Sequence, residues 1–362
     1  MKTLTRYILQ EFLKPFLVSL LLFSVIILII QVFNEMRYIM DNKPGFLLTL
    51  KYFSLQVPKL LMQIIPFAVL MAVLLSLSFL SKNSELIAMR AGGVSIYLVA
   101  GPLVFCGLVV CCVSVFLNEV VVPKTVRMER HTRVVEIQHQ SEPSASLFRQ
   151  NISMLSLNNR FYHLGTFDGG SKTMTDILML EFGKDVHLRS RVDAKKAVFE
   201  SGQWVFYNGY LRAFDDSDNE ISAQGFEKMP LTLPERPEDF LKEQKEPSEL
   251  GFIELIALIR QLKANGADDH KELVELYNKI AFPFGCVILA VLGVPWGWTM
   301  KRFSGIVISF GVCILVAFFY LGGMQIGRNL GNSGVLSPFA SMWTINILFG
   351  LIGPYLLFRK NR

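Results

Sequence analysis

Six long runs without a charged residue constrain this 362-residue chain more than any other feature. They cover residues 15–34, 60–81, 91–118, 280–300, 303–327 and 329–358. A helix rises about 1.5 Å per residue, so about 20 apolar residues cross the hydrocarbon core of a bilayer. The chain is 52% hydrophobic and only 18% charged, which leaves too little charged surface for a soluble protein of this length. The sequence therefore predicts an α-helical membrane protein with six spans, three at each end.

The flanking charges predict how these spans are oriented. The first run is too long for the apolar part of a signal peptide and lacks a small-residue cleavage site, so we expect it to remain as a span. Basic residues in the short segments on the N-terminal side outnumber those on the other side by about two to one. Both termini are therefore expected inside and the long central insert outside. The net charge of +6 reflects these flanking residues and does not indicate nucleic-acid binding.

The central insert has a different pattern. From about residue 145 to 235, short alternating segments such as 152–157 and 204–207 are separated by turn residues, which predicts antiparallel strands. The length allows about eight or more strands in a sandwich, a jelly roll or an open barrel-like fold. No disulfide is expected there, because all the cysteines lie in the apolar runs: Cys106, Cys111, Cys112, Cys286 and Cys313.

These patterns predict three parts. The first is a transmembrane half over residues 1–133, with spans at about 15–34, 60–81 and 96–118. The second is the all-β domain over 134–236. The third, 237–362, contains a helical linker and the second transmembrane half, with spans at about 278–299, 303–326 and 337–358.

The stretch SKNSELIAMRAGGVS, residues 81–95, lies in the narrow gap between the second and third spans. Ser84 is expected to cap a helix that runs from Glu85 to Ala91, and Gly92-Gly93 to end it. Such a helix would lie on the inner face. We expect it to present four residues for contact with a cytosolic partner: Glu85, Leu86, Met89 and Arg90. The alternative is an interfacial helix that only turns the chain.

A basic cluster follows the third span, with four residues spaced by three: Lys124, Arg127, Arg130 and Arg133. This spacing suggests one side of a helix, and Arg side chains suit the phosphates of an anionic lipid headgroup. The alternative is a solvated surface that anchors the span.

Three glycines at intervals of four lie at the outer end of the fifth span: Gly323, Gly327 and Gly331. Small residues at this spacing allow another helix to approach closely. They indicate either packing within the bundle or a helix that parts from a neighbour to admit substrate. We expect the second, with contact to residues 25–33 of a partner subunit's first span.

The sequence offers no catalytic or metal-binding pattern. Gly169-Gly170-Ser171-Lys172-Thr173 lacks the glycine spacing of a nucleotide-binding loop and reads as a hairpin turn. The five histidines are scattered, which argues against a metal site. We therefore expect no enzyme activity, no bound cofactor and no bound metal in this chain.

Several segments together resemble the lipopolysaccharide export permease family, the membrane subunits of the Lpt ABC transporter. They are Arg6-Tyr7-Ile8, residues 84–95, Asn118 with Pro123, residues 277–283, Pro338 and residues 343–346. Each segment alone is weakly specific. Their order around three plus three spans and a β insert is more specific, and the resemblance covers the whole chain.

The resemblance implies a bacterial inner-membrane protein with a periplasmic β-jelly-roll-like domain. Two such permeases, usually paralogues, would pair and bind two copies of a cytosolic ATPase, which binds the ATP. The first and fifth spans of opposite subunits would form lateral gates to the outer leaflet. The β domain would pass lipopolysaccharide to periplasmic bridge proteins.

The resemblance also assigns residues. The helix in residues 84–95 would dock into the ATPase with Glu85, and Arg37, Arg127 and Arg130 match positions that contact the substrate's phosphates. Some members carry a lysine in the first span where this chain has Gln31. The alternative class is a non-transporting signalling or force-transmitting membrane protein whose β domain binds a periplasmic protein.

Overall fold

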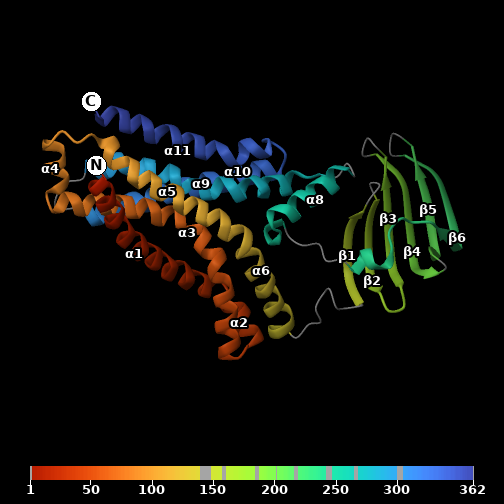
Figure 1. The fold of residues 1–362 in the computed structure, drawn as a ribbon. Coiled ribbons are helices and arrows are strands. Elements are labelled where there is room, and N and C mark those ends of the chain that lie inside the picture. Colours follow the sequence, from red (N-terminus) through yellow and green to blue (C-terminus); the bar gives the residue numbers. More distant parts are fainter. Residues whose placement is uncertain are drawn as a thin grey trace. The chain divides into compact units, whose positions relative to one another are not determined.

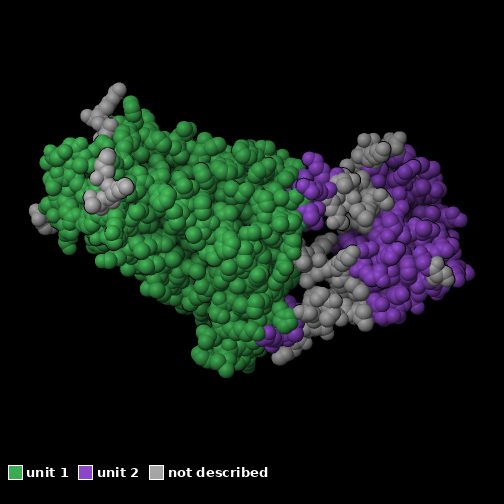
Figure 2. Space-filling model, in the orientation of Figure 1, with its two compact units in different colours: residues 1–133, 247–256, 270–362 green, residues 134–246, 257–269 purple. Residues whose placement is uncertain are grey.

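The computed structural model divides the chain into two compact units (Figure 2). It describes residues 2–138, 148–156, 160–183, 187–200, 202–215, 219–241, 247–264, 268–299 and 305–361. The first unit, called the membrane unit, contains Met1–Arg133, Pro247–Ile256 and His270–Arg362. The second, called the β unit, contains Val134–Glu246 and Ala257–Asp269.

The membrane unit is built from long helices joined by short ones (Figure 1). Before the insert they are α1 (Lys2–Asn34), α2 (Met36–Asn42), α3 (Phe46–Lys82), α4 (Glu85–Ala91), α5 (Ile96–Val120) and α6 (Val122–His131). After the insert they are α9 (His270–Trp298), α10 (Gly305–Asn332) and α11 (Pro338–Asn361). Six helices of the described chain are long and apolar enough to cross a membrane, which confirms the predicted span count.

Several helices extend beyond the apolar runs that predicted them. α3 begins at Phe46, although the uncharged run begins at residue 60, and it carries Lys51 and Lys59 in the added turns. An uncharged run measures the thickness of hydrocarbon crossed and not the length of the helix, which continues into the headgroup layer and water. We therefore expect helices of this unit, such as α3, to extend beyond the hydrocarbon layer.

Helices α3 and α9 form the centre of the membrane unit. Phe67, Leu70 and Leu74 of α3 and Leu289 of α9 are buried in one apolar cluster. Close contact depends on small residues: a Cβ on Gly107 of α5 would lie 2.9 Å from the Cys286 carbonyl oxygen of α9. In lipid, such close packing is a main source of helix association, because burying apolar surface there gains little.

The β unit contains one six-stranded antiparallel sheet in the order β1-β2-β3-β4-β5-β6. Its strands are β1 (Phe148–Ser156), β2 (Arg160–Asp168), β3 (Thr173–Phe182), β4 (Leu188–Glu200), β5 (Gln203–Phe214) and β6 (Glu220–Leu231). The all-β insert is confirmed, and the structure describes six strands where the length allowed about eight or more. The strands run for 9 to 13 residues, longer than the alternating segments suggested, so fewer fit the same length. Each described strand pairs with its sequence neighbours, a meander without the Greek-key order that defines a jelly roll in the strict sense.

Aromatic side chains fill the core of the β unit. Phe240 of the short helix α7 (Pro237–Leu241) is fully buried, and its ring lies 5.4 Å from that of Tyr162 and 5.8 Å from that of Trp204. Tyr162 donates a hydrogen bond to the buried Glu235 carboxylate at 2.8 Å, and the Trp204 indole donates to the Glu235 backbone oxygen. Burial, and secondarily the Glu235 charge, raise the pKa of Tyr162, so this hydroxyl stays protonated as a donor. The segment after β6 is thereby fixed to the sheet.

The junctions of the insert are helical. A π-helical segment, η1 (Thr132–Ile137), follows α6, and on return come η2 (Pro247–Glu249), a 3₁₀ turn, and α8 (Phe252–Ala264). Asn265 and Gly266, which follow α8, lie outside the described residues.

Candidate functional site

Helix α4 spans Glu85–Ala91, the bounds expected from the sequence. Its C-terminal end is closed by Gly93, which has φ +75°. The N–H of Gly93 donates to the Arg90 carbonyl and that of Val94 to the Met89 carbonyl, which is a Schellman motif. The N-terminal cap differs from the prediction: Ser84 has φ 64° and its side chain makes no capping hydrogen bond, because its backbone is already turned left-handed.

The residues expected to face a partner mostly hold α4 to its own bundle. Leu86 is 2% exposed in the cluster that contains Ile8 and Phe12 of α1, and Met89 packs on this cluster. The Tyr7 hydroxyl donates to Glu85 Oε2 at 2.7 Å. The Arg90 guanidinium lies 5.5 Å from the centre of a Trp298 ring in α9.

The prediction that Leu86 is exposed for docking is therefore wrong. On this helix of two turns, Leu86 is buried in the cluster that contains residues of α1, and the next residue, Ile87, points away from it. The outward side consists of Ile87, which is 54% exposed, with the exposed Ala88 and Ala91. Tyr97, 47% exposed at the start of α5, adds another exposed apolar group. We call Ile87, Ala88 and Ala91 the outward face of α4.

The basic cluster does not form one side of a helix. A spacing of three falls short of a full turn by about 60° each time, so four such residues sweep half of the circumference. Lys124 is exposed, whereas the Arg133 guanidinium lies 4.7 Å from the centre of the Tyr38 ring in α2. Arg37, also on α2, is exposed. Arg133 therefore contacts α2 of its own chain, whereas Lys124 and Arg37 are exposed.

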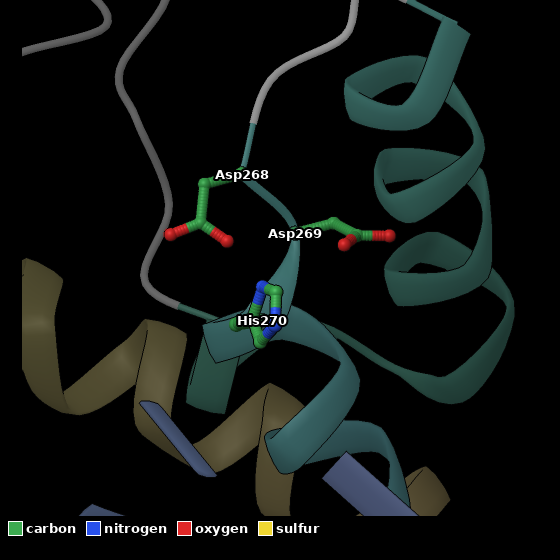
Figure 3. A group of neighbouring side chains, drawn as sticks. All are labelled: Asp268, Asp269 and His270. Atoms are coloured by element: carbon green, nitrogen blue, oxygen red, sulfur yellow. The ribbon is translucent and has the colours of Figure 1, made fainter. Parts of the chain in front are cut away.

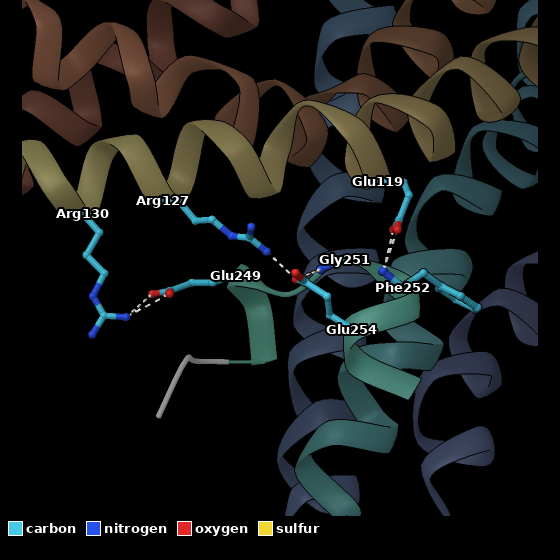
Figure 4. Close-up of polar contacts among 7 residues, drawn as sticks. All are labelled: Glu119, Arg127, Arg130, Glu249, Gly251, Phe252 and Glu254. Carbon is cyan, nitrogen blue, oxygen red and sulfur yellow. Dashed lines mark hydrogen bonds and ion pairs between the residues drawn. The ribbon is translucent and has the colours of Figure 1, made fainter. Parts of the chain in front are cut away.

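Arg127 and Arg130 both point toward the segment that returns from the insert (Figure 4). Arg130 Nη1 donates to both carboxylate oxygens of Glu249, at 3.0 and 2.9 Å. Arg127 Nη2 forms an ion pair with Glu254. Sequence analysis missed these partners, and nothing local to the arginines could reveal carboxylates more than a hundred residues away. We call the two ion pairs the carboxylate clasp.

The glycine stripe of α10 faces α11 of the same chain. A Cβ on Gly327 would lie 2.2 Å from the Ser341 backbone oxygen, and one on Gly323 would lie 2.4 Å from Ile345. Gly331 likewise lies against Ser341. The expected contact of Gly323, Gly327 and Gly331 with a partner subunit is therefore wrong, because the neighbouring helix of the bundle already fills this face. The pattern correctly indicated a close helix contact, but not which helix.

The exposed apolar side of α10 is a different one. Phe318 is 73% exposed, and Leu315, Phe319 and Ile326 are also exposed. α1 is similarly bare, with Leu21 and Phe33 among its exposed residues. Of the six spans, these two have the smallest buried share in their most apolar window.

Two buried polar contacts within the spans were not predicted. Tyr320 donates to Asn346 Oδ1 and Asn346 Nδ2 donates to the Ala281 carbonyl, both at 2.7 Å, which ties α10, α11 and α9 together. Lys279 of α9 is buried near Glu275, which pairs with Arg328. Polar residues inside a span are a signal that could have identified both.

Asp268, Asp269 and His270 offer ligand atoms within 4.8 Å of one another at the start of α9 (Figure 3). The three are consecutive in the chain, which accounts for their proximity. Acidic residues are also stabilised ahead of a helix by its dipole, so this group alone does not indicate a metal centre.

The described geometry combines six spans, a β insert, a short helix fixed between two spans and two arginines that form ion pairs with the segment after the insert. A search among curated proteins found no match to the chain. The model of the family described as lipopolysaccharide export system permease LptF/LptG matches residues 6–359. Because this match covers nearly the whole chain, the protein belongs to the LptF/LptG family of lipopolysaccharide export permeases, as its sequence segments predicted.

Proposed function

We propose that this chain pairs with a second permease of its family, takes lipopolysaccharide from the outer leaflet of the inner membrane and passes it to a periplasmic bridge. Family membership makes it a multi-pass inner-membrane permease subunit and not an enzyme. In our proposal the energy comes from a separate cytosolic ATPase dimer that binds the ATP, and this chain holds no cofactor.

The observation that carries the proposal is the fixation of α4. This helix is tied to α1 through Tyr7 and Leu86 and to α9 through Arg90, yet its outward face is apolar and exposed. A partner that pushes on the outward face would therefore move α1 as well. We propose that the outward face, with Glu85 and Arg90 beside it, receives the ATPase.

The position of α4 supports the proposed orientation. Within the membrane unit, α4 and both chain termini lie at one end of the helices, whereas α2 lies at the other (Figure 1). Together with the excess of basic residues, this supports cytoplasmic termini and a periplasmic β unit.

The bare sides of α1 and α10 support pairing and lateral entry. In the most apolar window of each span, 6% of the residues are buried in α1 and 22% in α10, against 83% in α3. We propose that α1 and α10 meet the corresponding spans of the partner permease and form the gates. We also propose that Arg127 and Arg130 contact the phosphates of the lipid, together with Lys124 of the same helix and Arg37 of α2.

The test is to replace Ile87 by Asp in the outward face. We expect the variant to insert and remain folded, but to lose most of the copurifying ATPase, because a charge would be desolvated in the apolar contact. Lipid export should fall in parallel. Ile221→Asp is the matched control, since Ile221 is 67% exposed in β6 and lies outside the proposed docking surface.

Undiminished ATPase binding by Ile87→Asp would count against docking at α4. Export can be separated from recruitment by analysing the copurified lipid by mass spectrometry. A complex that retains the ATPase but carries no lipopolysaccharide would favour the non-transporting, force-transmitting alternative.

A further inference from the structure

We infer that Glu249 and Glu254 determine lipid specificity by occupying Arg127 and Arg130, and that only a lipid with more than one phosphate displaces both. The inference rests on the proposed function, because it takes these arginines as the contact for lipid phosphates. It adds that the site contains its own competing anions.

The Arg130–Glu249 pair, called the inner pair, is the less exposed and the stronger of the two ion pairs in the clasp. The Glu249 side chain is 10% exposed and accepts from a single Arg130 nitrogen through both of its oxygens, while the Arg130 side chain is 32% exposed. A partly buried charge pair is costly to break when one member is left without a partner. A ligand that only approaches Arg130 therefore cannot open this pair cheaply.

The Arg127–Glu254 pair, called the outer pair, opens more easily. The side chains of Arg127 and Glu254 are 43% and 45% exposed, and such pairs contribute little to stability in water. Glu254 also accepts the Gly251 N–H at 3.3 Å at the start of α8. The carboxylate keeps this partner and the favourable end of the helix dipole when Arg127 leaves it.

A separate contact holds the returning segment in place. Both carboxylate oxygens of Glu119 accept the Phe252 N–H at 2.7 Å (Figure 4). This anchor uses no arginine and holds the start of α8 to the end of α5, so the segment stays in place when the clasp opens. Glu249 and Glu254 therefore remain tethered competitors at a high effective concentration.

Selectivity follows from the number of charges exchanged. Arg127 and Arg130 are three residues apart on α6, so two neighbouring phosphates can contact both. Each phosphate offers more charge and more acceptor oxygens than the carboxylate it replaces. A phospholipid with one negative charge gains contacts to one arginine and leaves the inner pair closed. The clasp thus rejects common single-phosphate lipids and admits a lipid that carries several.

The experiment uses the full-length protein with its partners in phosphatidylcholine nanodiscs that contain either phosphatidylglycerol or lipopolysaccharide. In the double variant Glu249→Gln/Glu254→Gln we expect phosphatidylglycerol to bind about tenfold more, as one charge-assisted hydrogen bond no longer competes. Lipopolysaccharide binding should change much less, so the preference for lipopolysaccharide over phosphatidylglycerol should fall. Glu275→Gln is the matched control, because it releases Arg328 in the same unit without touching the clasp.

A second variant separates specificity from stability. Arg130→Glu/Glu249→Arg re-forms the inner pair with reversed charges, so we expect near-normal thermal unfolding but reduced lipopolysaccharide binding. If the swap instead binds lipopolysaccharide normally, the pair is only structural and the inference is overturned.

The remaining outcomes distinguish the inference from the proposed function. If Arg127→Gln/Arg130→Gln loses lipopolysaccharide while Glu249→Gln/Glu254→Gln leaves phosphatidylglycerol binding unchanged, the arginine contact stands and the inference is wrong. If the arginine variant binds lipopolysaccharide as well as the unmodified protein, the arginine contact itself fails, and the inference fails with it.

Discussion

Helices α3 and α9 differ from α1 and α10 in how far their own chain covers them. In the most apolar window of each span, 83% of the residues are buried in α3 and 67% in α9, against 6% in α1 and 22% in α10. In water such bare helices would be unstable, but lipid chains cover them without penalty. The fold is therefore specified by the covered spans, and the bare surfaces are free to exchange lipid for another helix. A gate needs surfaces of this second kind.

The largest difference between the two kinds of span is expected when one phenylalanine ring is removed from each. Phe67 of α3 is 5% exposed, whereas Phe318 of α10 is 73% exposed. We expect Phe67→Ala to destabilise the folded chain by about 3–5 kcal/mol, because it leaves a cavity. Phe318→Ala should leave stability nearly unchanged and weaken pairing with the second permease. Thermal unfolding and subunit copurification measure the two effects; equal destabilisation by both variants would contradict the comparison.

A smaller effect is expected from glycines on opposite sides of α10. Gly327→Leu would place a side chain against the Ser341 backbone and destabilise the α10–α11 contact by about 1–3 kcal/mol. Gly322 has no neighbouring atom within 4 Å of an added Cβ, so Gly322→Leu should be tolerated. Protease resistance of the purified protein compares the two. If Gly322→Leu proved the more damaging, the stripe would not be the packed side.

The smallest effect concerns the hydrogen bond that fixes the covered side of α10. Tyr320→Phe leaves the buried Asn346 oxygen without its donor, and we expect a loss of about 1 kcal/mol. Tyr355 is 64% exposed on α11, so Tyr355→Phe should unfold at the same temperature as the unmodified protein. A normal unfolding temperature for Tyr320→Phe would mean that packing alone holds this side.

The spans and the bounds of α4 could be predicted because the relevant forces act locally along the chain. Crossing hydrocarbon requires an uninterrupted apolar run, and a glycine such as Gly93 ends a helix through its own left-handed backbone. The exposed side of α4 could not be predicted, since Leu86 is buried by Ile8 and Phe12 of a distant segment.

The candidate lipid site was predicted only in part for the same reason. Spacing identified Arg127 and Arg130 as neighbours, but their partners Glu249 and Glu254 come after the whole inserted domain in the sequence. The glycine stripe shows a related limit. Small residues every fourth position require a close helix, yet the choice between α11 and a partner subunit depends on the assembled bundle.

The meander of the β unit has a consequence for biosynthesis. Because every described strand pairs with the strand before or after it, the contacts of this sheet are local in sequence, and local contacts raise the folding rate. The membrane unit is different, since α3 and α5 contact α9, which is synthesised only after the whole insert. Domains generally fold as units during synthesis. The sheet can thus be complete while the first three spans still wait for their partners, and a ribosome that stalls before residue 270 would leave a finished β unit on an unfinished membrane anchor.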